Sequence, residues 1–512
     1  MGNTLVKIEN LIQKYKALLI ILGATFIVRL PSLFEPLWYG DESIYLTIGQ
    51  KILRGGLMYV DIFDHKTPGI YYLTAGTLGV LGESIWSIKF LLMIWVLITL
   101  VVFYFLGKKL FNHKVALIAT IILAAFTSTP LIEGNIFNSE ILMILPISLG
   151  ILAGLHKRFF LAGVLFSLAV LLKIPAVFDF AAFFIFIGLS ISKASAANVV
   201  KNLSRLTLGL LVPIILTAVY FFFNGALEDY FQSAVLFNVS YTGYGNKFII
   251  ENGLLIVKAI PIILVLTYFF ARVHSRLTRK KAPSRNLYEF LVIWLIFSLF
   301  GAAFGGRPYE HYLIQVIPAF SLIAAASFFN RHFAKIGVVS LTVAIIFAVF
   351  FGFRTWFNPT YYSNFFRFAA DKITFEEYVG NFDSVAPRNY AVASFLTGCG
   401  KYTSQNRCAA TRTTSSDKLY VFADHPSIYF LSGLDPASRF ITYYHIKGGP
   451  SEKAATAWEI LENKPTHILV KNPRPGPFPT LENILSSRYN LFAHYEDMAI
   501  YKVKSSSNNP SD

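Results

Sequence analysis

The chain has 512 residues, of which 55% are hydrophobic and 14% are charged, and its mean hydropathy is +0.54. Ordinary soluble domains carry roughly a quarter charged residues, so this composition excludes a soluble globular protein. The net charge of +16 would suit a nucleic-acid partner, but the basic residues concentrate in short links between apolar runs, which argues against nucleic acid.

Apolar runs close to membrane-crossing length recur through residues 1–353. A helix needs roughly 20 apolar residues to cross a bilayer. The first run is long and is followed by Arg29 rather than by a small-residue cleavage site, which favours a retained anchor over a cleaved signal peptide. We predict eleven spans, at 17–34, 84–106, 115–131, 138–155, 159–172, 175–192, 206–223, 253–270, 288–304, 313–329 and 336–353.

The basic links predict the orientation of these spans. With eleven spans, every basic cluster falls on one side, and basic loops stay in the cytoplasm. We therefore expect a cytoplasmic N-terminus and an extracytoplasmic C-terminal region in a plasma or inner membrane. The clusters lie at 7–16, 108–114, 157–158, 193–205, 272–285 and 331–335.

The polar segments that carry the candidate functional side chains all fall on the opposite, outer side. In the first outer loop, 35–83, ESIYLTIGQKIL predicts a helix in the interface, and PGIYYLTAGTLGVLG predicts a second interfacial or re-entrant element, since 10–14 apolar residues rarely cross alone. The other outer segments are the turn from Glu133 to Glu140, the Lys173 turn, and residues 224–251 and 305–312.

Residues 354–504 predict a small extracytoplasmic α/β domain, and 505–512 a disordered tail. Strand and helix patterns alternate there: strands at 418–424 and 467–472, a helix at 457–463 and a hairpin at 491–504.

Both cysteines of the chain, Cys399 and Cys408, lie in this outer region. An oxidising compartment would favour a disulfide that closes a short loop, whereas a reducing one would leave two free thiols. A zinc site on the cysteines is not expected, because no CxxC or His-rich partner accompanies them.

A pair of carboxylates, Asp41 and Glu42, begins the predicted helix of the first loop. Negative charge is favourable in the first turn of a helix, so a purely structural role is one interpretation. The other rests on their neighbours, because Tyr45 follows one turn later and Lys66 lies in the same loop. A half-buried carboxylate near a lysine suits general-base chemistry.

Three cations, Lys66, Lys173 and Arg307, share the predicted outer side. Lys173 lies between two apolar runs, where an unpaired cation would cost about 2.5–3.5 kcal/mol at the bilayer centre; it either snorkels to the interface or finds a partner. Arg307 follows two glycines, which allow a close backbone approach, and its guanidinium matches a phosphate or carboxylate. Together they indicate an anionic, lipid-borne ligand.

The loop DESIYLTIGQKILRGGLMYVDIFDHKTPGIYYL resembles the first outer loop of the GT-C membrane glycosyltransferases, in particular the branch of protein O-mannosyltransferases and lipid A aminoarabinose transferases. That branch has an Asp-Glu pair and a Lys-Pro-Pro-like element before an aromatic pair; here Lys66-Thr67-Pro68 lacks the middle proline. The resemblance continues in FNSEILMILP, in KIP where the family usually has Thr-Lys-Gly-Pro, in GGRPYEHYLIQVIP and in DKLYVFADHPSIYFLSGLDPASRF. Residues 397–416 have no counterpart in it.

The resemblance implies transfer of a sugar, with inversion, from a polyprenyl-phosphate donor to a hydroxyl acceptor (a glycan, lipid or protein) on the outer membrane face. It implies that Asp41 is the catalytic base. It also implies that Lys66 and Arg307 hold the donor phosphate, with Lys173 as an optional third group. No cofactor is required, although Asp41, Glu42 and Asp64 or His65 could bind a divalent ion if they converge. The pocket would be lined by Glu42, Tyr45, His65, Glu140, Tyr309 and His311.

Two other classes of protein fit the sequence less well. A transporter or lipid flippase would place ionisable residues near span midpoints and repeat one half in the other, and neither pattern is found. A non-catalytic scaffold that binds through the outer domain would leave the grouping of Asp41, Lys66 and Arg307 without a purpose.

Overall fold

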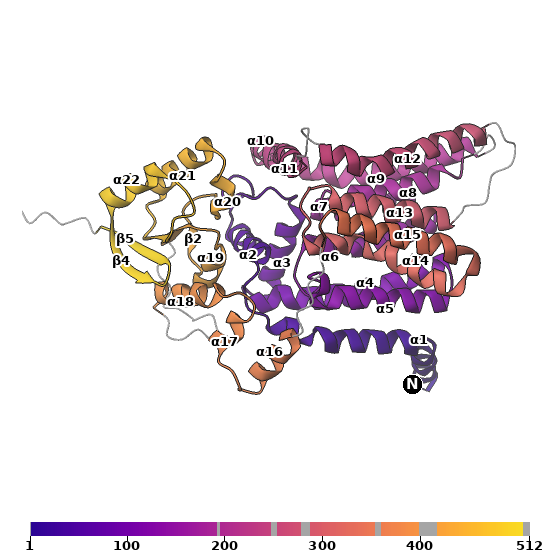
Figure 1. The fold of residues 1–512 in the computed structure, drawn as a ribbon, viewed down its shortest axis with the longest axis horizontal. Coiled ribbons are helices and arrows are strands. Elements are labelled where there is room, and N and C mark those ends of the chain that lie inside the picture. The colour runs from indigo at the N-terminus through magenta and orange to yellow at the C-terminus, as the bar shows by residue number, and fades with distance from the viewer. Residues whose placement is uncertain are drawn as a thin grey trace, which may run out of the picture.

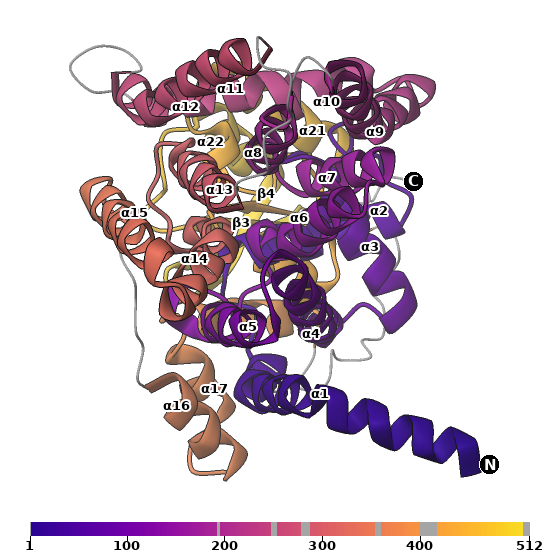
Figure 2. The ribbon, with the colours of Figure 1, turned by 90° about the vertical axis from the view of Figure 1, so that its right-hand side faces the viewer.

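The protein is described here from a computed structural model, in residues 2–191, 195–246, 253–277, 287–353, 360–398 and 417–504. Its long helices lie roughly side by side, and the C-terminal sheet lies at one end of them, far from the N-terminus (Figure 1). Figure 2 looks at the helices from that other end.

Each of the eleven predicted spans coincides with a helix, which confirms the polytopic helical fold. Within the described ranges, five of these helices are long and apolar enough to cross a membrane, and the other six are shorter apolar helices. The helices are α1 (Gly2–Arg29), α4 (Ile85–Leu110), α5 (His113–Ser128), α6 (Ser139–Leu155), α7 (Phe159–Leu172), α8 (Ala176–Gly188), α9 (Ala196–Phe223), α12 (Gly253–Leu277), α13 (Leu287–Ala303), α14 (Ile317–Phe329) and α15 (Arg331–Phe350).

The predicted helix of the first outer loop is α2 (Gly40–Leu53), and the interfacial or re-entrant element predicted after it is also a helix, α3 (Gly69–Leu81), which packs against α2. α2 starts where the sequence predicts, with its two acids in the first turn, and Pro68 immediately precedes α3. Figure 1 shows them between the helical bundle and the C-terminal sheet.

The outer segment after α9 is helical, which the sequence did not predict. It consists of α10 (Leu227–Phe231), a π-helical turn (Gln232–Leu236) and α11 (Phe237–Gly245). The Asn238 side chain donates to the backbone oxygen of His65 at 2.5 Å, which joins this segment to the first outer loop.

The C-terminal region contains a five-stranded sheet in the order β2-β1-β3-β5-β4. β1 runs parallel to β2 and β3, and β3–β5–β4 are antiparallel, with the predicted hairpin between β4 and β5. The strands are β1 (Lys418–Phe422), β2 (Asp435–Pro436), β3 (His467–Lys471), β4 (Tyr489–Tyr495) and β5 (Met498–Val503). The accompanying helices are α19 (Ser427–Ser432), α20 (Tyr443–Ile446), α21 (Pro450–Asn463) and α22 (Pro479–Arg488).

Three short helices precede the sheet and connect it to the bundle: α16 (Thr360–Ala369), α17 (Phe375–Gly380) and α18 (Ala386–Leu396). From α18, the Tyr390 hydroxyl accepts a hydrogen bond from the backbone N–H of Leu37 at 2.7 Å. From α16, the Tyr361 hydroxyl donates to Glu35. These contacts fix the beginning of the first outer loop.

Ion pairs connect the same loop to the sheet. Asp435, in β2, lies 3.1 Å from Lys51 and 2.6 Å from Arg54, at the end of α2. The first outer loop is thus held from both sides, and the site below depends on it. The predicted disulfide of Cys399 and Cys408 falls in 399–416, and the predicted tail is 505–512; both lie outside the described residues.

Candidate active site

A cavity of about 440 Å³ lies at the junction of the helical bundle, the first outer loop and the C-terminal region. Its walls come from the segments that the sequence places on the outer side: residues 39–44, 64–67, 173–175, 238–242 and 301–315. Residues 424–445 of the C-terminal region close it. Segments far apart in sequence therefore meet at one place.

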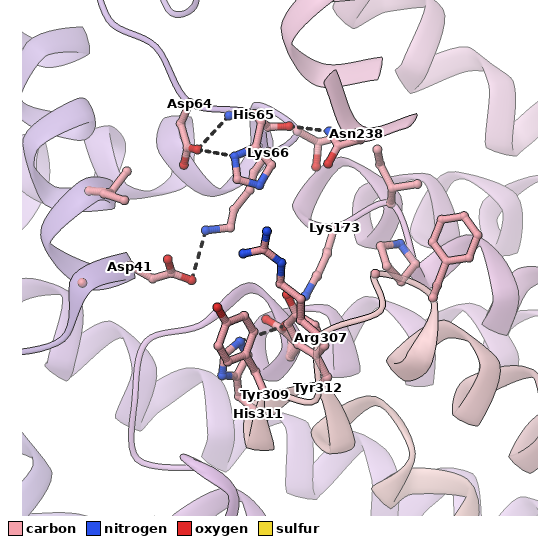
Figure 3. Close-up of a pocket in the computed structure, with 18 of the residues that line it drawn as sticks. Asp41, Asp64, His65, Lys66, Lys173, Asn238, Arg307, Tyr309, His311 and Tyr312 are labelled. Carbon is pink, nitrogen blue, oxygen red and sulfur yellow. Dashed lines mark hydrogen bonds and ion pairs between the residues drawn. The ribbon is translucent and has the colours of Figure 1, made fainter. Parts of the chain in front are cut away.

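Asp41 and Lys66 form an ion pair in this cavity. The Lys66 ammonium lies 3.0 Å from Asp41 Oδ2, and the two side chains are 18% and 29% exposed respectively. Figure 3 shows them pointing toward each other, with Arg307 and Lys173 also directed into the cavity. The predicted base and the predicted phosphate-binding cations thus share one space.

The electrostatics of the pair keep both groups charged. Burial by itself would raise the pKa of Asp41, but Lys66 and then His311 more than offset it, so this pKa lies below its usual value. Burial would lower the pKa of Lys66, but Asp41, Tyr45 and Asp64 hold it well above its usual value. An ionised Asp41 can accept a proton at neutral pH.

The backbone that carries Lys66 is held by close contacts. The Tyr59 hydroxyl donates to the Lys66 carbonyl oxygen at 2.7 Å. A Cβ at Gly69 would lie 2.5 Å from the Leu171 carbonyl oxygen, so only glycine lets the start of α3 approach the end of α7 this closely. This approach brings Lys66 near Lys173, which follows α7.

Of the two glycines before Arg307, Gly306 makes the close backbone approach that the sequence predicts. Gly306 has φ +71°, and a Cβ there would lie 2.3 Å from the Gly245 carbonyl carbon. The Arg307 guanidinium lies 5.7 Å from the centre of the Tyr444 ring, a cation–π distance. Further along, the Gln315 amide donates to the Pro175 carbonyl oxygen at 2.9 Å and so fixes this segment to the Lys173 turn.

Lys173 is paired rather than snorkelling. It forms an ion pair with Glu140, at the start of α6, and lies 3.8 Å from the Tyr312 ring centre. Glu140, to which the sequence assigned no role, is thereby a counterion in the cavity wall. His311 Nε2 lies 3.5 Å from the same carboxylate.

His311 is clamped on its other nitrogen by a group that sequence reasoning missed. Its Nδ1 lies 2.5 Å from Glu133 Oε2, and the Tyr39 hydroxyl donates to that oxygen at 2.8 Å. Tyr309 stacks on the imidazole at 5.7 Å between ring centres. Glu133 has φ +58°, an uncommon conformation for a non-glycine residue.

Two residues predicted for the pocket lie outside its lining. Glu42 is completely buried on the other side of α2, where its carboxylate lies 2.8 Å from the Lys89 ammonium and accepts from the Phe137 N–H at 2.7 Å. Successive helical residues point about 100° apart, so Asp41 and its neighbour cannot face the same way. Tyr45 is fully buried behind the ion pair, with its ring centre 4.8 Å from the Lys66 ammonium.

The C-terminal region supplies cavity residues that sequence reasoning missed: Asp424, Thr442, Tyr444 and His445. Of these, only Asp424 lies in a stretch that the resemblance covers, DKLYVFADHPSIYFLSGLDPASRF. The Tyr444 N–H donates to the Asp424 carboxylate at 2.7 Å, which orients the ring that faces Arg307.

The metal set considered from the sequence does not assemble, because Glu42 points away from the cavity. Asp64, His65 and His445 converge instead, with one ligand atom of each within 4.8 Å of the others. Asp64 Oδ1 lies 2.9 Å from His65 Nδ1 and 3.4 Å from His445 Nε2. His65, predicted for the pocket, does line it.

Known proteins resemble this chain in a segment and in the whole fold. Residues 65–222 match the family model described as "Dolichyl-phosphate-mannose-protein mannosyltransferase". No curated protein sequence matches the chain.

Two solved structures of ArnT from Cupriavidus metallidurans share the fold. The one bound to undecaprenyl phosphate is 12% identical, with 97% of this chain and 100% of that chain covered and a TM-score of 0.52. The apo structure is 14% identical, with 94% and 97% covered and a TM-score of 0.52. The matched segment thus resembles a family of mannosyltransferases, and the chain as a whole shares the fold of ArnT.

Proposed function

We propose that this protein transfers a sugar from a polyprenyl-phosphate donor to a hydroxyl acceptor at the extracytoplasmic membrane surface, with inversion at the anomeric carbon. The observation that carries the proposal is the Asp41–Lys66 ion pair in a cavity that also receives Arg307 and Lys173. A transporter would have no use for a base and phosphate-binding cations in one cavity, and the GT-C fold favours transfer.

In the proposed reaction, Asp41 accepts the proton of the acceptor hydroxyl while the hydroxyl oxygen attacks the anomeric carbon. A bond from this oxygen to the carbon forms, and the bond from the carbon to the donor phosphate oxygen breaks. Polyprenyl phosphate leaves with an added negative charge. Lys66 and Arg307 would stabilise this charge as it develops, which is electrostatic transition-state stabilisation.

The ion pair itself suggests how donor binding would prepare the base. The Lys66 ammonium lies 3.0 Å from Asp41 Oδ2. A donor phosphate would compete with Asp41 for the Lys66 ammonium. Withdrawal of the ammonium would raise the pKa of Asp41 and uncover one of its carboxylate oxygens for the acceptor. Lys66 would thus bind the donor phosphate and, by leaving Asp41, free that carboxylate to act as the base.

The proposed donor explains why the cavity lies where the bundle meets the C-terminal region. A polyprenyl chain stays in the bilayer, so its phosphate must be met at the boundary between lipid and water. ArnT, which shares the fold, was solved with undecaprenyl phosphate, which supports a donor of this class. The predicted orientation places this end outside the cytoplasm.

Incubation of the purified full-length protein with radiolabelled polyprenyl-phosphate sugars and membrane extract tests the proposal. We expect label to move to a hydroxyl-bearing acceptor with release of polyprenyl phosphate. Nucleotide sugars in parallel reactions should give no transfer. Transfer from nucleotide sugars without any from lipid-linked ones would contradict the proposed donor class.

Lys66→Ala and Arg307→Ala should each weaken donor binding by about 10- to 100-fold, because a charge-assisted hydrogen bond to phosphate contributes roughly 1.5–3 kcal/mol. Acceptor KM should change much less. Polyprenyl phosphate binding and the two KM values measure this split. Lys447→Ala and Arg474→Ala, in exposed positions of the C-terminal region, are the matched controls. Donor affinity equal to that of the controls would remove the phosphate assignment.

A further inference from the structure

The cavity wall on the side of the helical bundle includes a buried amide that has no part in the proposed reaction. Gln315 ends the short 3₁₀ helix (Glu310–Gln315) that follows Arg307, and it lines the cavity although the residue is only 3% exposed. A Cβ at Gly301, on α13, would lie 2.7 Å from Gln315 Nε2, so any side chain at that position would displace the amide. The fold therefore makes space for this particular side chain.

Hydrogen bonds decide which way the amide faces. Gln315 Nε2 donates to the Pro175 carbonyl oxygen at 2.9 Å and to Asp179 Oδ2 at 2.7 Å. A carbonyl oxygen can only accept, so the nitrogen rather than the oxygen of the amide must face Pro175. Both N–H groups are thereby used, and the amide can offer a ligand only its oxygen.

Asp179, the second partner of the amide, is held in turn. It lies in α8, is 1% exposed, and accepts from Trp294 Nε1, on α13, at 2.6 Å. The chain Trp294–Asp179–Gln315 thus joins two helices of the bundle to the cavity wall. Hydrogen bonds in such a chain polarise one another, so the bond to Asp179 makes Gln315 Oε1 a stronger acceptor.

The oxygen Oε1 of Gln315 is open to a ligand. Among the described residues it has no hydrogen-bond partner, and it is not one of the fully enclosed side-chain atoms. Since Gln315 lines the cavity, this oxygen reaches it. An amide oxygen and an ionised phosphodiester both only accept hydrogen bonds and cannot bond to each other, whereas a sugar hydroxyl can donate. The position therefore favours a hydroxyl over the donor phosphate.

Gln315 lies on the side of the cavity that would receive the donor. It ends the segment that begins at Arg307, and its bond to Pro175 attaches it to the turn that holds Lys173. Arg307 and Lys173 both point into the cavity (Figure 3). The sugar is bonded directly to the donor phosphate, so a phosphate held by these cations would bring the sugar close to this wall.

We propose that Gln315 is a specificity-determining residue whose Oε1 accepts a hydrogen bond from a hydroxyl of the donor's sugar. The inference rests on the proposed function and adds which part of the donor this wall recognises. Lys66 and Arg307 would hold the phosphate by charge, and Gln315 would hold the sugar by a neutral hydrogen bond. A donor without that hydroxyl would leave a buried acceptor without a partner, which costs more than the bond itself contributes.

Gln315→Met removes the oxygen while nearly keeping the length and volume of the side chain. Equilibrium binding is measured on the purified full-length protein with plain undecaprenyl phosphate and with the sugar-bearing undecaprenyl phosphate that the wild type binds most tightly. We expect the variant to bind the sugar-bearing lipid about 5- to 10-fold more weakly than the wild type does, and plain undecaprenyl phosphate equally well. Gln232→Met, at an exposed position of the π-helical turn after α10, is the matched control and should change neither affinity.

Donors that each lack one hydroxyl of the same sugar give a second measurement, which begins with the wild type alone. One of them should bind the wild type about 5- to 10-fold more weakly than the complete donor does, and Gln315→Met should abolish that difference, because the partner of the hydroxyl is already absent. If Gln315→Met fails to fold because the Asp179 carboxylate loses a donor, Gln315→Met with Asp179→Asn removes that carboxylate as well, and the same differences are expected.

Equal affinity of the wild type and folded Gln315→Met for the sugar-bearing lipid would overturn the proposal, even if the acceptor KM changed. So would a parallel loss of affinity for both lipids, or a wild type that binds every deoxy donor as well as the complete one. A wild type that binds neither lipid would instead contradict the donor class proposed above. Because the readout is a ratio of binding constants and not turnover, the assignment can fail while sugar transfer succeeds, and it can hold where no transfer is detected.

Discussion

Asp41→Asn should lower kcat for sugar transfer by about 10²–10⁴-fold, the usual contribution of a positioned general base. Asparagine keeps the shape of the side chain but cannot take the proton of the acceptor hydroxyl. The Lys66 ammonium would lose its carboxylate partner and stay available for the donor phosphate. Donor affinity should therefore be unchanged or higher while turnover is lost.

This combination distinguishes a base from a structural residue. Steady-state turnover and polyprenyl phosphate binding are measured on the same preparation, together with the thermal midpoint. Asp61→Asn is the matched control, because its exposed carboxylate belongs to the same loop and accepts from the Leu57 N–H at 2.6 Å. Wild-type turnover in Asp41→Asn would exclude Asp41 as the base, and a parallel loss of donor binding would point to a collapsed cavity instead.

The fold could be predicted closely because lipid simplifies the problem. A spanning segment must be helical and apolar, so each apolar run of suitable length indicates one helix, and the basic links order the polar segments by side. α2 was predictable from the acids that mark its start, whereas for the region of α3 the sequence predicted only an interfacial or re-entrant element. The helical segment from α10 to α11 carries no comparable start signal, and it was missed.

The site could be predicted in part, from residues whose charge is costly near lipid. Asp41, Lys66, Lys173 and Arg307 stand out for that reason, and the cavity brings them together. The sequence could not tell which acid of the Asp-Glu pair faces the cavity, because that depends on how α2 is rotated against its neighbours. His445 was missed for a related reason: its partners in the first loop become neighbours only when the C-terminal region folds onto the loop.

Lys89 is the clearest example of a residue whose importance depends on tertiary structure. It sits near the start of α4, and nothing in the sequence separates it from an ordinary interfacial lysine. In the structure it is completely buried between two carboxylates, 3.1 Å from Glu35 and 2.8 Å from Glu42. Glu35 also accepts from the Asn135 amide at 2.7 Å. The lysine therefore connects α4 to the helix that carries Asp41.

Lys89→Met should reduce the free energy of unfolding by about 3–5 kcal/mol, because it leaves two buried carboxylates without their counterion. Burial already raises the pKa of Glu42, with Lys89 opposing the shift and Glu35 adding to it. Without the lysine this pKa rises further, so the folded state binds protons that the unfolded state releases, and the loss of stability should grow with pH. Thermal midpoints of the purified protein at pH 5 and pH 8 measure both effects.

The control and the rescue decide whether the cause is the unpaired charge. Lys109→Met removes an exposed lysine from the other end of α4 and should leave the midpoint near wild type. Adding Glu35→Gln and Glu42→Gln to Lys89→Met removes the stranded charges and should restore part of the lost stability, since neutral replacement of a whole buried ion group costs far less than removal of one member. A Lys89→Met midpoint equal to that of Lys109→Met, or a triple variant no more stable than Lys89→Met alone, would show that this network does not hold α2 in place.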